Sequence, residues 1–416
     1  MKENRVLVIG GGVVGVCSAY YLARAGWDVT LLEKGEICAG SSYGNGGLVV
    51  PGHSIPFAAP GVWVKGLKWM LNPESPFYIK PRLDRELIAW LWRFRGACTA
   101  ANVHRAVPVI RDLSYASLAL YRELAAIEGL EFGFRQDGAL KVFRTEKGLE
   151  EAVRGEARIL EAAGVGVKVL DAAAARQLEP SLLPEVLGGI LYPDDAHLIP
   201  DAFVKGLAGV AERLGVRVRT ATEVLGFTTA GRKIVAVETT RGDFAADEVV
   251  LAAGSWSPGL ARTLRLALPI QPGKGYSVTY RRPANGPRMP VILGEARMGL
   301  TPMGDRLRFA GTLELAGLDL SVNPRRVAAI TRAGRGYVTG MEELAIVEIW
   351  RGLRPCTPDG LPIIGRARRL SNLVLATGHA MIGVSLGPIT GKLVAEIASD
   401  RTPTVDVGPL APDRFD

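Results

Sequence analysis

The amino-acid sequence predicts an α/β fold of two domains, one of which is discontinuous along the chain. Residues 1–33 show the strand, glycine-rich turn, helix and strand of a parallel βαβ unit, and apolar strands that end in small residues recur near residues 250 and 375. Residues 268–351 instead have the strand and turn pattern of an antiparallel sheet. A chain of 416 residues also exceeds the roughly 250 to 300 residues of a single hydrophobic core.

The βαβ unit begins with an apolar strand at residues 5–9, followed by a helix at residues 13–26 and a second strand at residues 29–32. A GxGxxG motif joins the first strand to the helix. Its glycines permit a tight turn, the approach of a pyrophosphate and close packing of helix on strand, and the helix N-terminus attracts the phosphates. The residues of this predicted cofactor-binding turn are Gly10, Gly12, Val13, Val14 and Gly15.

An acidic residue, Glu33, follows the second strand, and Lys34 comes next. A carboxylate at this position accepts hydrogen bonds from an adenosine ribose and repels a 2′-phosphate. The motif therefore predicts a dinucleotide other than NADP, and by itself it does not distinguish FAD from NAD. The loop that follows is rich in small residues with hydroxyl and amide groups, which suits it to line a phosphate or a flavin edge: Ser41, Ser42, Asn45, Gly46 and Gly47.

The composition is that of an ordinary globular protein, with 48% hydrophobic and 22% charged residues. The net charge of +8 comes from scattered basic residues, which argues against a nucleic-acid partner and is compatible with anionic substrates or an anionic membrane face. The four cysteines and four histidines have no metal-ligand spacing, so no metal site is expected. With no signal segment before the first strand and no apolar run of roughly 20 residues, we expect a cytoplasmic protein.

Four of the seven tryptophans lie within residues 51–98, a segment that is also rich in proline. Within it, residues 61–71 form a short amphipathic stretch that mixes lysine with tryptophan, a composition suited to the interface between water and lipid. Two interpretations stay open. Trp63 and Trp69 would either contact the inner face of a membrane peripherally, or pack in the core of a second domain.

Between these landmarks, helical and extended patterns alternate. Residues 130–134 and 139–143 are interpreted as a β-hairpin closed by an Asp-Gly turn, which is foreign to a βαβ unit and indicates an inserted domain. Helices are expected at residues 84–98, 107–127, 146–163, 200–214 and 323–337, and strands at residues 216–220, 222–227, 234–239 and 248–252.

Two later strands end in turns that contain glycine. Residues 249–252 lead into Ala253 and Gly254, and residues 373–377 lead into Gly378. Small residues at these points let backbone approach a ligand at the carboxyl edge of a parallel sheet. A helix begins shortly after Gly378, and its N-terminal dipole would favour negative charge on a bound group. The residues at that N-terminus are Ile382, Gly383, Val384 and Ser385.

Together these patterns predict a discontinuous Rossmann-like cofactor domain at residues 1–55, 150–267 and 352–416, with an inserted α+β substrate domain on an antiparallel sheet at residues 56–149 and 268–351. The order and spacing of the motifs resemble the FAD-dependent D-amino acid dehydrogenases and glycine oxidases of the D-amino-acid-oxidase superfamily. The resemblance rests on VLVIGGG from Val6, SSYGNGG from Ser41, PGKGYSV from Pro272, GLRPCTPDG from Gly352, and Gly378-His379; residues 60–84 resemble the bacterial D-amino acid dehydrogenases in particular.

This resemblance implies FAD bound in an extended conformation and without a covalent bond. The pyrophosphate would lie at the glycine-rich turn, the ribose at Glu33 and the adenine near the backbone of Val224. The small-residue loop would lie near the isoalloxazine or the pyrophosphate, and residues 378–385 would cover the pyrimidine edge. Cys356 is too close to the turn that follows it to match the cysteine that carries the flavin in some relatives.

The resemblance also implies three candidate catalytic residues, Arg354, Tyr276 and His379. An arginine at the position of Arg354 binds the substrate carboxylate in relatives, and a guanidinium fork matches a carboxylate at two points. If residues 349–354 form a strand, Arg351 points to the opposite face. Tyr276 would either hydrogen-bond the carboxylate or fill the cavity, and His379 would either support its turn or transfer a proton.

The implied reaction is the oxidative deamination of a D-amino acid, in which hydride passes from the α-carbon to flavin N5 and the products are a 2-oxo acid and ammonia. The nearest alternative is oxidation of glycine or of a secondary amine such as D-proline, D-hydroxyproline or sarcosine. A non-enzymatic alternative is a flavin-binding subunit of a larger complex. The electron acceptor stays open among a quinone, a carrier protein and oxygen.

Overall fold

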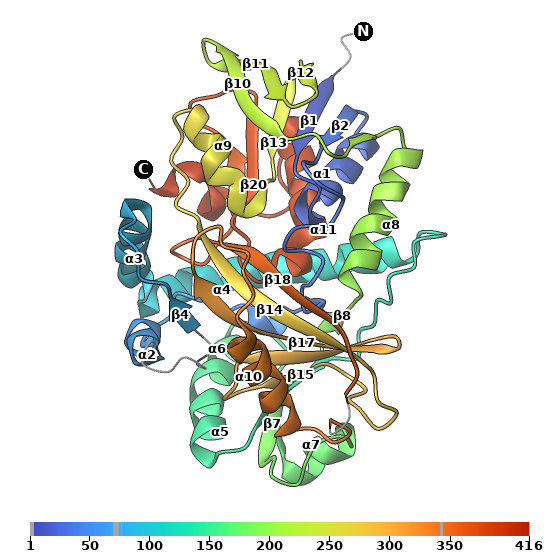
Figure 1. Ribbon diagram of the computed structural model, residues 1–416, viewed down its shortest axis with the longest axis vertical. Coiled ribbons are helices and arrows are strands. Elements are labelled where there is room, and N and C mark those ends of the chain that lie inside the picture. Colours follow the sequence, from blue (N-terminus) through green and yellow to red (C-terminus); the bar gives the residue numbers. More distant parts are fainter. Residues whose placement is uncertain (1–3, 70–74, 76, 342–343, 416) are drawn as a thin grey trace.

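The computed structural model describes residues 4–69, 75, 77–341 and 344–415. Two large sheets organise this part of the chain, and Figure 1 shows them one above the other, the six-stranded sheet in the upper half and the nine-stranded sheet in the lower half. The long helix α4 (Ala100–Ala125) crosses the view between them. The predicted α/β fold class, a Rossmann-like domain with an inserted domain, is confirmed.

The six-stranded sheet carries the βαβ unit. Its first strand pairs in parallel with a strand from the middle of the chain, which in turn pairs in parallel with one from near the C-terminus. This is the discontinuity that the two later strand-to-glycine turns predicted. In spatial order the strands are β19 (Ile363–Arg366), β20 (Leu373–Thr377), β13 (Glu248–Leu251), β1 (Arg5–Ile9), β2 (Asp28–Leu32) and β9 (Arg217–Arg219).

Apolar helices pack against this sheet. Their buried side chains join those of β1, β2 and β13 in one core, which also takes in the C-terminal half of α4 through Leu118, Tyr121 and Leu124. Helix α4 was expected in the substrate domain, yet it packs on the cofactor domain. The helices that contribute are α1 (Val13–Arg24), α8 (Pro200–Arg213) and α11 (Gly383–Ala398), and a small sheet of β10 (Val224–Ala230), β11 (Lys233–Thr239) and β12 (Gly242–Phe244) lies beyond β13.

The nine-stranded sheet is largely antiparallel, and helix α10 (Pro324–Arg335) packs on one of its faces. Most of its core side chains come from the strands and α10, and the rest come from α7 and the connecting segments. In spatial order the strands are β18 (Ile346–Cys356), β14 (Gln271–Arg281), β17 (Arg306–Leu315), β16 (Met298–Met303), β15 (Val291–Leu293), β5 (Ala139–Phe143), β7 (Gly188–Tyr192) and β6 (Lys168–Asp171), with β4 (Phe77–Ile79) paired to β17.

Side-chain caps explain where several helices begin. The Asp84 carboxylate accepts hydrogen bonds from the first turn of α3 (Arg85–Ala97), and Asp171 caps α7 (Ala172–Leu178) in the same way. Asn323 caps α10. The remaining helices are α2 (Val62–Trp69), α9 (Ser257–Thr263), and α5 (Glu146–Ala152) and α6 (Arg158–Ala162), which a π-helical turn at Val153–Ala157 joins; the two short pairing strands are β3 (Leu48–Val49) and β8 (Ala196–His197).

Three predictions differ from the structure. The hairpin of residues 130–134 with 139–143 is wrong, because β5 pairs with β7 and β15 while Leu130 and Phe132 pack into the core of the cofactor domain. Strands β6 and β7, expected in the 150–267 part of the cofactor domain, belong to the nine-stranded sheet. Helix α4 begins seven residues before the predicted Val107, because Thr99 caps it and Pro108 is accommodated inside it. Residues 70 and 71 of the amphipathic stretch lie outside the described residues.

We predict that the contact between α1 and α11 is intolerant of a single added methyl group. A Cβ at Gly391 would lie 2.4 Å from the carbonyl carbon of Cys17 in α1. Alanine has the better helix propensity, so any loss must come from this clash, and we expect Gly391→Ala to lower the free energy of unfolding by about 1–3 kcal/mol. Chemical denaturation measures the change.

Gly209→Ala is the matched control. Gly209 lies in α8, and its Cβ would meet no atom closer than 3.9 Å. We expect this variant to gain up to about 1 kcal/mol from helix propensity. Equal stability changes in the two variants would contradict the proposed tight contact.

Candidate functional site

The glycine-rich turn lies at the carboxyl edge of the six-stranded sheet. At two of its positions, the neighbouring backbone leaves no space for a side chain. Gly10 has φ +111°, and a Cβ there would lie 2.6 Å from the carbonyl oxygen of Ala252. A Cβ at Gly15 would lie 1.8 Å from the carbonyl oxygen of Gly10. The turn therefore brings the N-terminus of α1 directly onto the ends of β1 and β13.

Glu33 lies at the tip of β2, half-buried, with both carboxylate oxygens facing backbone amides. Oε2 accepts a hydrogen bond from Gly11 N at 2.7 Å, and Oε1 accepts one from Gly35 N at 2.8 Å. Its own carbonyl accepts from Thr222 N, which brings the start of β10, and so Val224, to the same end of the sheet. The side chain of Lys34 is instead exposed, with its ammonium over the ring of Trp256 at 4.1 Å.

The small-residue loop links three elements of the site. Ser42 Oγ accepts a hydrogen bond from Val13 N at 3.0 Å, at the first turn of α1. Ser41 Oγ donates to the carbonyl oxygen of Leu353 in β18 at 2.5 Å. Asn45 Nδ2 donates to the backbone of the turn that precedes α11. The loop thus spans from the predicted pyrophosphate site to the strand that carries Arg354.

A buried arginine that the sequence did not single out holds this loop in place. Arg308 on β17 is 2% exposed, and its Nη1 donates to the carbonyl oxygens of Tyr43 at 2.9 Å and Asn45 at 3.0 Å. Its Nε donates to Thr279 Oγ1 at 3.1 Å. No ion pair of Arg308 is found in the described part of the chain. Burial lowers its pKa from the usual value, yet a guanidinium stays charged at neutral pH.

Strand β18 crosses the carboxyl edge of the six-stranded sheet, where the other strand-end turns meet it. Ser255, directly after Ala253 and Gly254, donates its hydroxyl to the carbonyl oxygen of Leu353 at 2.9 Å. Ala380 N, two residues after Gly378, donates to the carbonyl oxygen of Pro355 at 2.9 Å. The sequence-predicted turns therefore all come together around residues 353–356.

Arg354 lies on the face of β18 and β14 that carries Gly273, Gly275 and Trp350. Its guanidinium lies across Gly275, where a Cβ would be 2.2 Å from Nη1, so glycine is needed for the arginine to adopt this position. Nη1 donates to the carbonyl oxygen of Thr312 at 2.5 Å. Arg354 makes no ion pair with any described residue. A half-buried cation without a carboxylate of its own is suited to an anionic ligand.

The structure does not bring Tyr276 to Arg354. Tyr276 pairs with Arg351, so both side chains are on the opposite face of the sheet, as the alternation of a strand requires. The Tyr276 hydroxyl lies 3.3 Å from both carboxylate oxygens of Glu314 and accepts a hydrogen bond from Asn323 N at the start of α10. Its surroundings are the core under α10, and a role at the carboxylate is not supported by this placement.

His379 is buried behind the turn. Its Nε2 is 2.9 Å from the hydroxyl of Thr390 in α11, and desolvation lowers its pKa to about 3, so the imidazole is neutral at physiological pH. This environment favours support of the turn over proton transfer. Cys356, in the same region, is also buried, and desolvation raises the pKa of its thiol to about 12, which makes it a poor nucleophile.

Gly378 has φ +78°, and α11 begins five residues later at Gly383, with Ile382 at its N-cap. The N-cap residues of α1 and α11 make no side-chain cap, and neither helix has an acidic residue in its first turn. Both helix N-termini therefore leave positive potential for a bound anion or an electron-rich ring. The described residues include no group of His, Cys, Asp or Glu placed to hold a metal ion, and no helix among them is long and apolar enough to cross a membrane.

Comparison with known proteins decides the family. A family model described as "DAO: FAD dependent oxidoreductase" matches residues 5–397. The protein belongs to this family. It is 38% identical to a D-amino acid dehydrogenase of Methylobacterium radiotolerans across 99% of both chains.

Solved structures agree with this family assignment. A glycine oxidase from Geobacillus kaustophilus superposes with a TM-score of 0.80 at 25% identity, over 99% of both chains. The L-proline dehydrogenase from P. horikoshii shares the fold, with a TM-score of 0.79 at 23% identity over 99% of this chain and 98% of that one. The family resemblance and the cofactor FAD that the sequence indicated are confirmed.

The residues of this DAO-family chain fit FAD. The glycine-rich turn leaves open space beside Gly12, where a Cβ would meet only Ser42 Oγ within 4 Å, at 3.4 Å. The start of α1, where the N-cap residue Gly12 has no capping side chain, suits the pyrophosphate, and Glu33 retains carboxylate lone pairs for a ribose. The exact contacts of the individual residues with FAD, and the absence of a covalent bond, stay predictions.

We predict that Arg308 contributes to FAD affinity through the small-residue loop. Arg308→Met leaves the carbonyl groups of Tyr43 and Asn45 without their donor, and each unpaired buried carbonyl costs about 1–3 kcal/mol. We therefore expect FAD to bind about tenfold or more weakly. Fluorescence titration of the apoprotein with FAD measures this affinity.

Arg306→Met is the matched control, since Arg306 is an exposed arginine on the same strand whose nearest acid is Asp305 at 3.9 Å. This variant should bind FAD like the wild type. Unchanged FAD affinity in Arg308→Met would show that the loop holds its position without the arginine.

Proposed function

We propose that this flavoprotein oxidatively deaminates D-amino acids, giving a 2-oxo acid and ammonia. The observation that carries the proposal is Arg354, a half-buried guanidinium without a carboxylate partner among the described residues, at the point where the turns after β2, β13 and β20 converge. Support also comes from the 38% identity to a D-amino acid dehydrogenase over nearly the full length of both chains.

In this proposal the protein orients the substrate more than it activates it. The two outer nitrogens of Arg354 form a fork that binds a carboxylate at two points and so fixes the α-carbon relative to the site. When bound, FAD would supply at its N5 atom the acceptor for the hydride of the α-carbon, and water would hydrolyse the resulting imino acid to the 2-oxo acid and ammonia. The substrate reacts as the free amine, and no strong base is required, which agrees with a neutral His379 turned towards Thr390.

We predict that Arg354 governs substrate affinity. Anaerobic addition of D-alanine to the wild-type holoenzyme should bleach the yellow flavin, and Arg354→Met should raise the substrate concentration needed by about 100-fold, since loss of a partner of a buried charge pair costs roughly 2–5 kcal/mol. The flavin absorbance is the measurement. Arg351→Met, on the opposite face of β18, is the control and should behave like the wild type.

The same assay distinguishes the alternatives. D-proline, sarcosine and glycine belong in the panel, and bleaching by one of these in preference to D-alanine would assign the chain to secondary-amine or glycine oxidation. If none of the four bleaches the flavin of the purified chain, the enzymatic proposal fails and a flavin-binding subunit of a larger complex remains. Reoxidation of the bleached enzyme by oxygen, a quinone or a carrier protein then identifies the electron acceptor.

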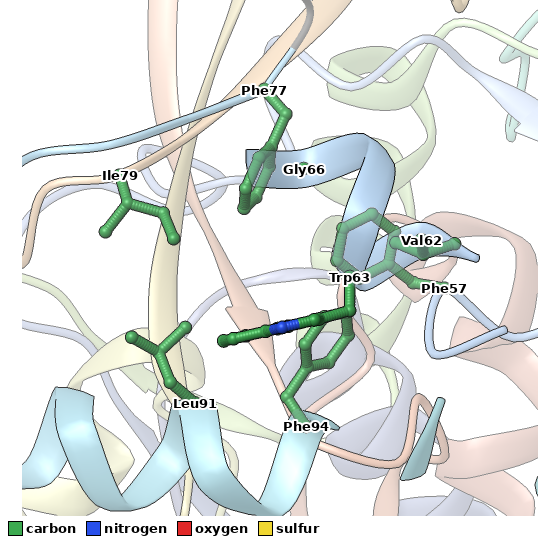
Figure 2. Close-up of a pocket in the computed structure, with 8 residues that line it drawn as sticks. All are labelled: Phe57, Val62, Trp63, Gly66, Phe77, Ile79, Leu91 and Phe94. Atoms are coloured by element: carbon green, nitrogen blue, oxygen red, sulfur yellow. The ribbon is translucent and has the colours of Figure 1, made fainter. Parts of the chain in front are cut away.

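We also propose a peripheral membrane contact, at a different surface from the one that the tryptophan content suggested. Figure 2 shows the indole of Trp63 turned into an apolar pocket between α2 and α3, with Phe77, Leu91 and Phe94 among the lining residues, so this ring is partly buried against the protein. A group of exposed apolar side chains lies on and next to α3, with Leu83 at 104%, Ile88 at 48% and Trp92 at 65% exposure.

Exposed arginines surround these apolar side chains. Arg85, Arg93 and Arg95 are on the same helix, and the Arg95 guanidinium lies 5.4 Å from the ring centroid of Trp92. Apolar side chains flanked by arginine suit an anionic lipid surface, such as the inner face of a membrane. The protein would then be cytoplasmic with a peripheral contact, and a quinone would be within reach as electron acceptor.

We predict that Trp92→Ser combined with Ile88→Ser weakens binding to vesicles of phosphatidylglycerol at least tenfold. Each of the two apolar side chains would contribute about 1.5–3 kcal/mol when it is buried in the lipid. Co-sedimentation measures the bound fraction. Leu225→Ser is the control, since Leu225 is 59% exposed on β10 of the cofactor domain. Equal vesicle binding by the wild type and the double variant would remove this surface from consideration.

A further inference from the structure

Strand β17 contains a bulge directly opposite the backbone on which Arg354 lies. Lys274 of β14 pairs with Glu314, and Tyr276 pairs with Gly311. Two residues of β17, Thr312 and Leu313, therefore face the single residue Gly275. Bulges of this kind change the direction in which side chains project and are common beside active sites.

Thr312 occupies the extra position in a conformation that suits glycine far better. Its φ is +59°, in the left-handed region, where a β-branched residue is a genuine outlier. Such strain costs on the order of 1–3 kcal/mol and persists where the surrounding structure enforces it, frequently at functional sites. A strained threonine at a position where glycine fits better indicates that its side chain has a function.

Both polar groups of Thr312, its carbonyl oxygen and its hydroxyl, indicate a role at the Arg354 site. Its carbonyl oxygen accepts the hydrogen bond from Arg354 Nη1. Its hydroxyl Oγ1 is buried and has no hydrogen-bond partner among the described residues. An unpaired buried hydroxyl is costly, so a group absent from the protein itself is expected to satisfy it. The threonine thus contacts the guanidinium through its backbone and has a spare donor on its side chain.

The opposite face of the sheet anchors this bulge. Glu314, two residues later, is 5% exposed and forms an ion pair with Arg326 Nε at 2.6 Å and with Lys274 Nζ at 3.2 Å. Arg326 is held in turn by the carbonyl oxygen of Ser75. Breaking a buried pair of this kind costs several kcal/mol, which is enough to hold Thr312 in its strained conformation.

We infer that Thr312 is a substrate-binding residue whose hydroxyl donates a hydrogen bond to the carboxylate that Arg354 binds. The carboxylate is the partner in preference to the amine, because the adjacent guanidinium attracts the one and repels a protonated form of the other. The inference rests on the proposed function in taking an amino acid as ligand. It adds a second donor to the carboxylate site and identifies the bulge as the element that places both donors.

Thr312→Gly separates this role from a structural one, since the two roles predict opposite outcomes. Glycine relieves the strain at φ +59° and removes the hydroxyl, so the variant should unfold at an equal or higher denaturant concentration than the wild type. Its affinity for substrate should nevertheless fall about tenfold or more, the usual effect of losing a hydrogen bond to a charged group. Thr312→Ser keeps the hydroxyl and should retain affinity within about threefold.

The measurements use the holoenzyme. Anaerobic bleaching titrations with D-alanine give substrate affinity, and titrations with pyruvate, followed by the flavin absorbance, give the affinity for a carboxylate without turnover. Weaker binding of both ligands by Thr312→Gly, with stability unchanged or raised and Thr312→Ser near the wild type, supports the inference. Wild-type affinity in Thr312→Gly overturns it, and so does a loss of affinity in Thr312→Ser as large as in Thr312→Gly.

Failure of the proposed function is recognised separately. If no amine in the panel bleaches the wild-type flavin, the pyruvate titration alone decides the role of Thr312. Pyruvate binding that weakens in both Arg354→Met and Thr312→Gly then supports a carboxylate site shared by the two residues. Pyruvate binding that weakens only in Arg354→Met, or that the wild type lacks, overturns the inference.

Discussion

The carbonyl group of Leu353 is the junction on which the arrangement of the site depends. It accepts one hydrogen bond from Ser41, in the loop after β2, and one from Ser255, in the turn after β13. Leu353 itself is in β18, an edge strand of the other sheet. One backbone oxygen therefore fixes the substrate sheet against two strand ends of the cofactor sheet, and Arg354 follows it by one residue. These two hydrogen bonds thus fix how far Arg354, the proposed carboxylate-binding residue, lies from the cofactor domain.

Buried charge is divided between the two faces of the nine-stranded sheet. On the α10 face, the carboxylates of Glu314 and Asp319 pair with Arg326 and Lys274 in one cluster. On the other face, Arg308 and Arg354 hydrogen-bond backbone carbonyls, and neither has an ion pair within the described ranges. Ion pairs on the α10 face hold the strands in position. On the face towards the cofactor domain, Arg308 holds the small-residue loop, and Arg354 keeps the positive charge that the proposed carboxylate site requires.

Local patterns were enough to predict the nucleotide-binding elements of the cofactor domain. The GxGxxG turn, Glu33 and the strand-to-glycine turns each follow from residues within about 30 positions, because a βαβ unit is a local structure. Sequence reasoning failed where partners are distant. The strand at residues 139–143 was joined to its neighbour in sequence although its partners are β7 and β15, and the positions of Tyr276, Arg308 and Thr312 depend on a sheet register and a bulge that have no local signal.

The order of strands in the six-stranded sheet has a consequence for biosynthesis. Strand β1 needs β13 beside it and β13 needs β20, so the sheet closes only after nearly the whole chain has left the ribosome. Pairings so distant in sequence are slow to form. The N-terminal glycine-rich turn therefore lacks its neighbouring strands until residues near the C-terminus have been synthesised. FAD then binds the folded chain, and the free energy of unfolding rises as the concentration of free FAD rises.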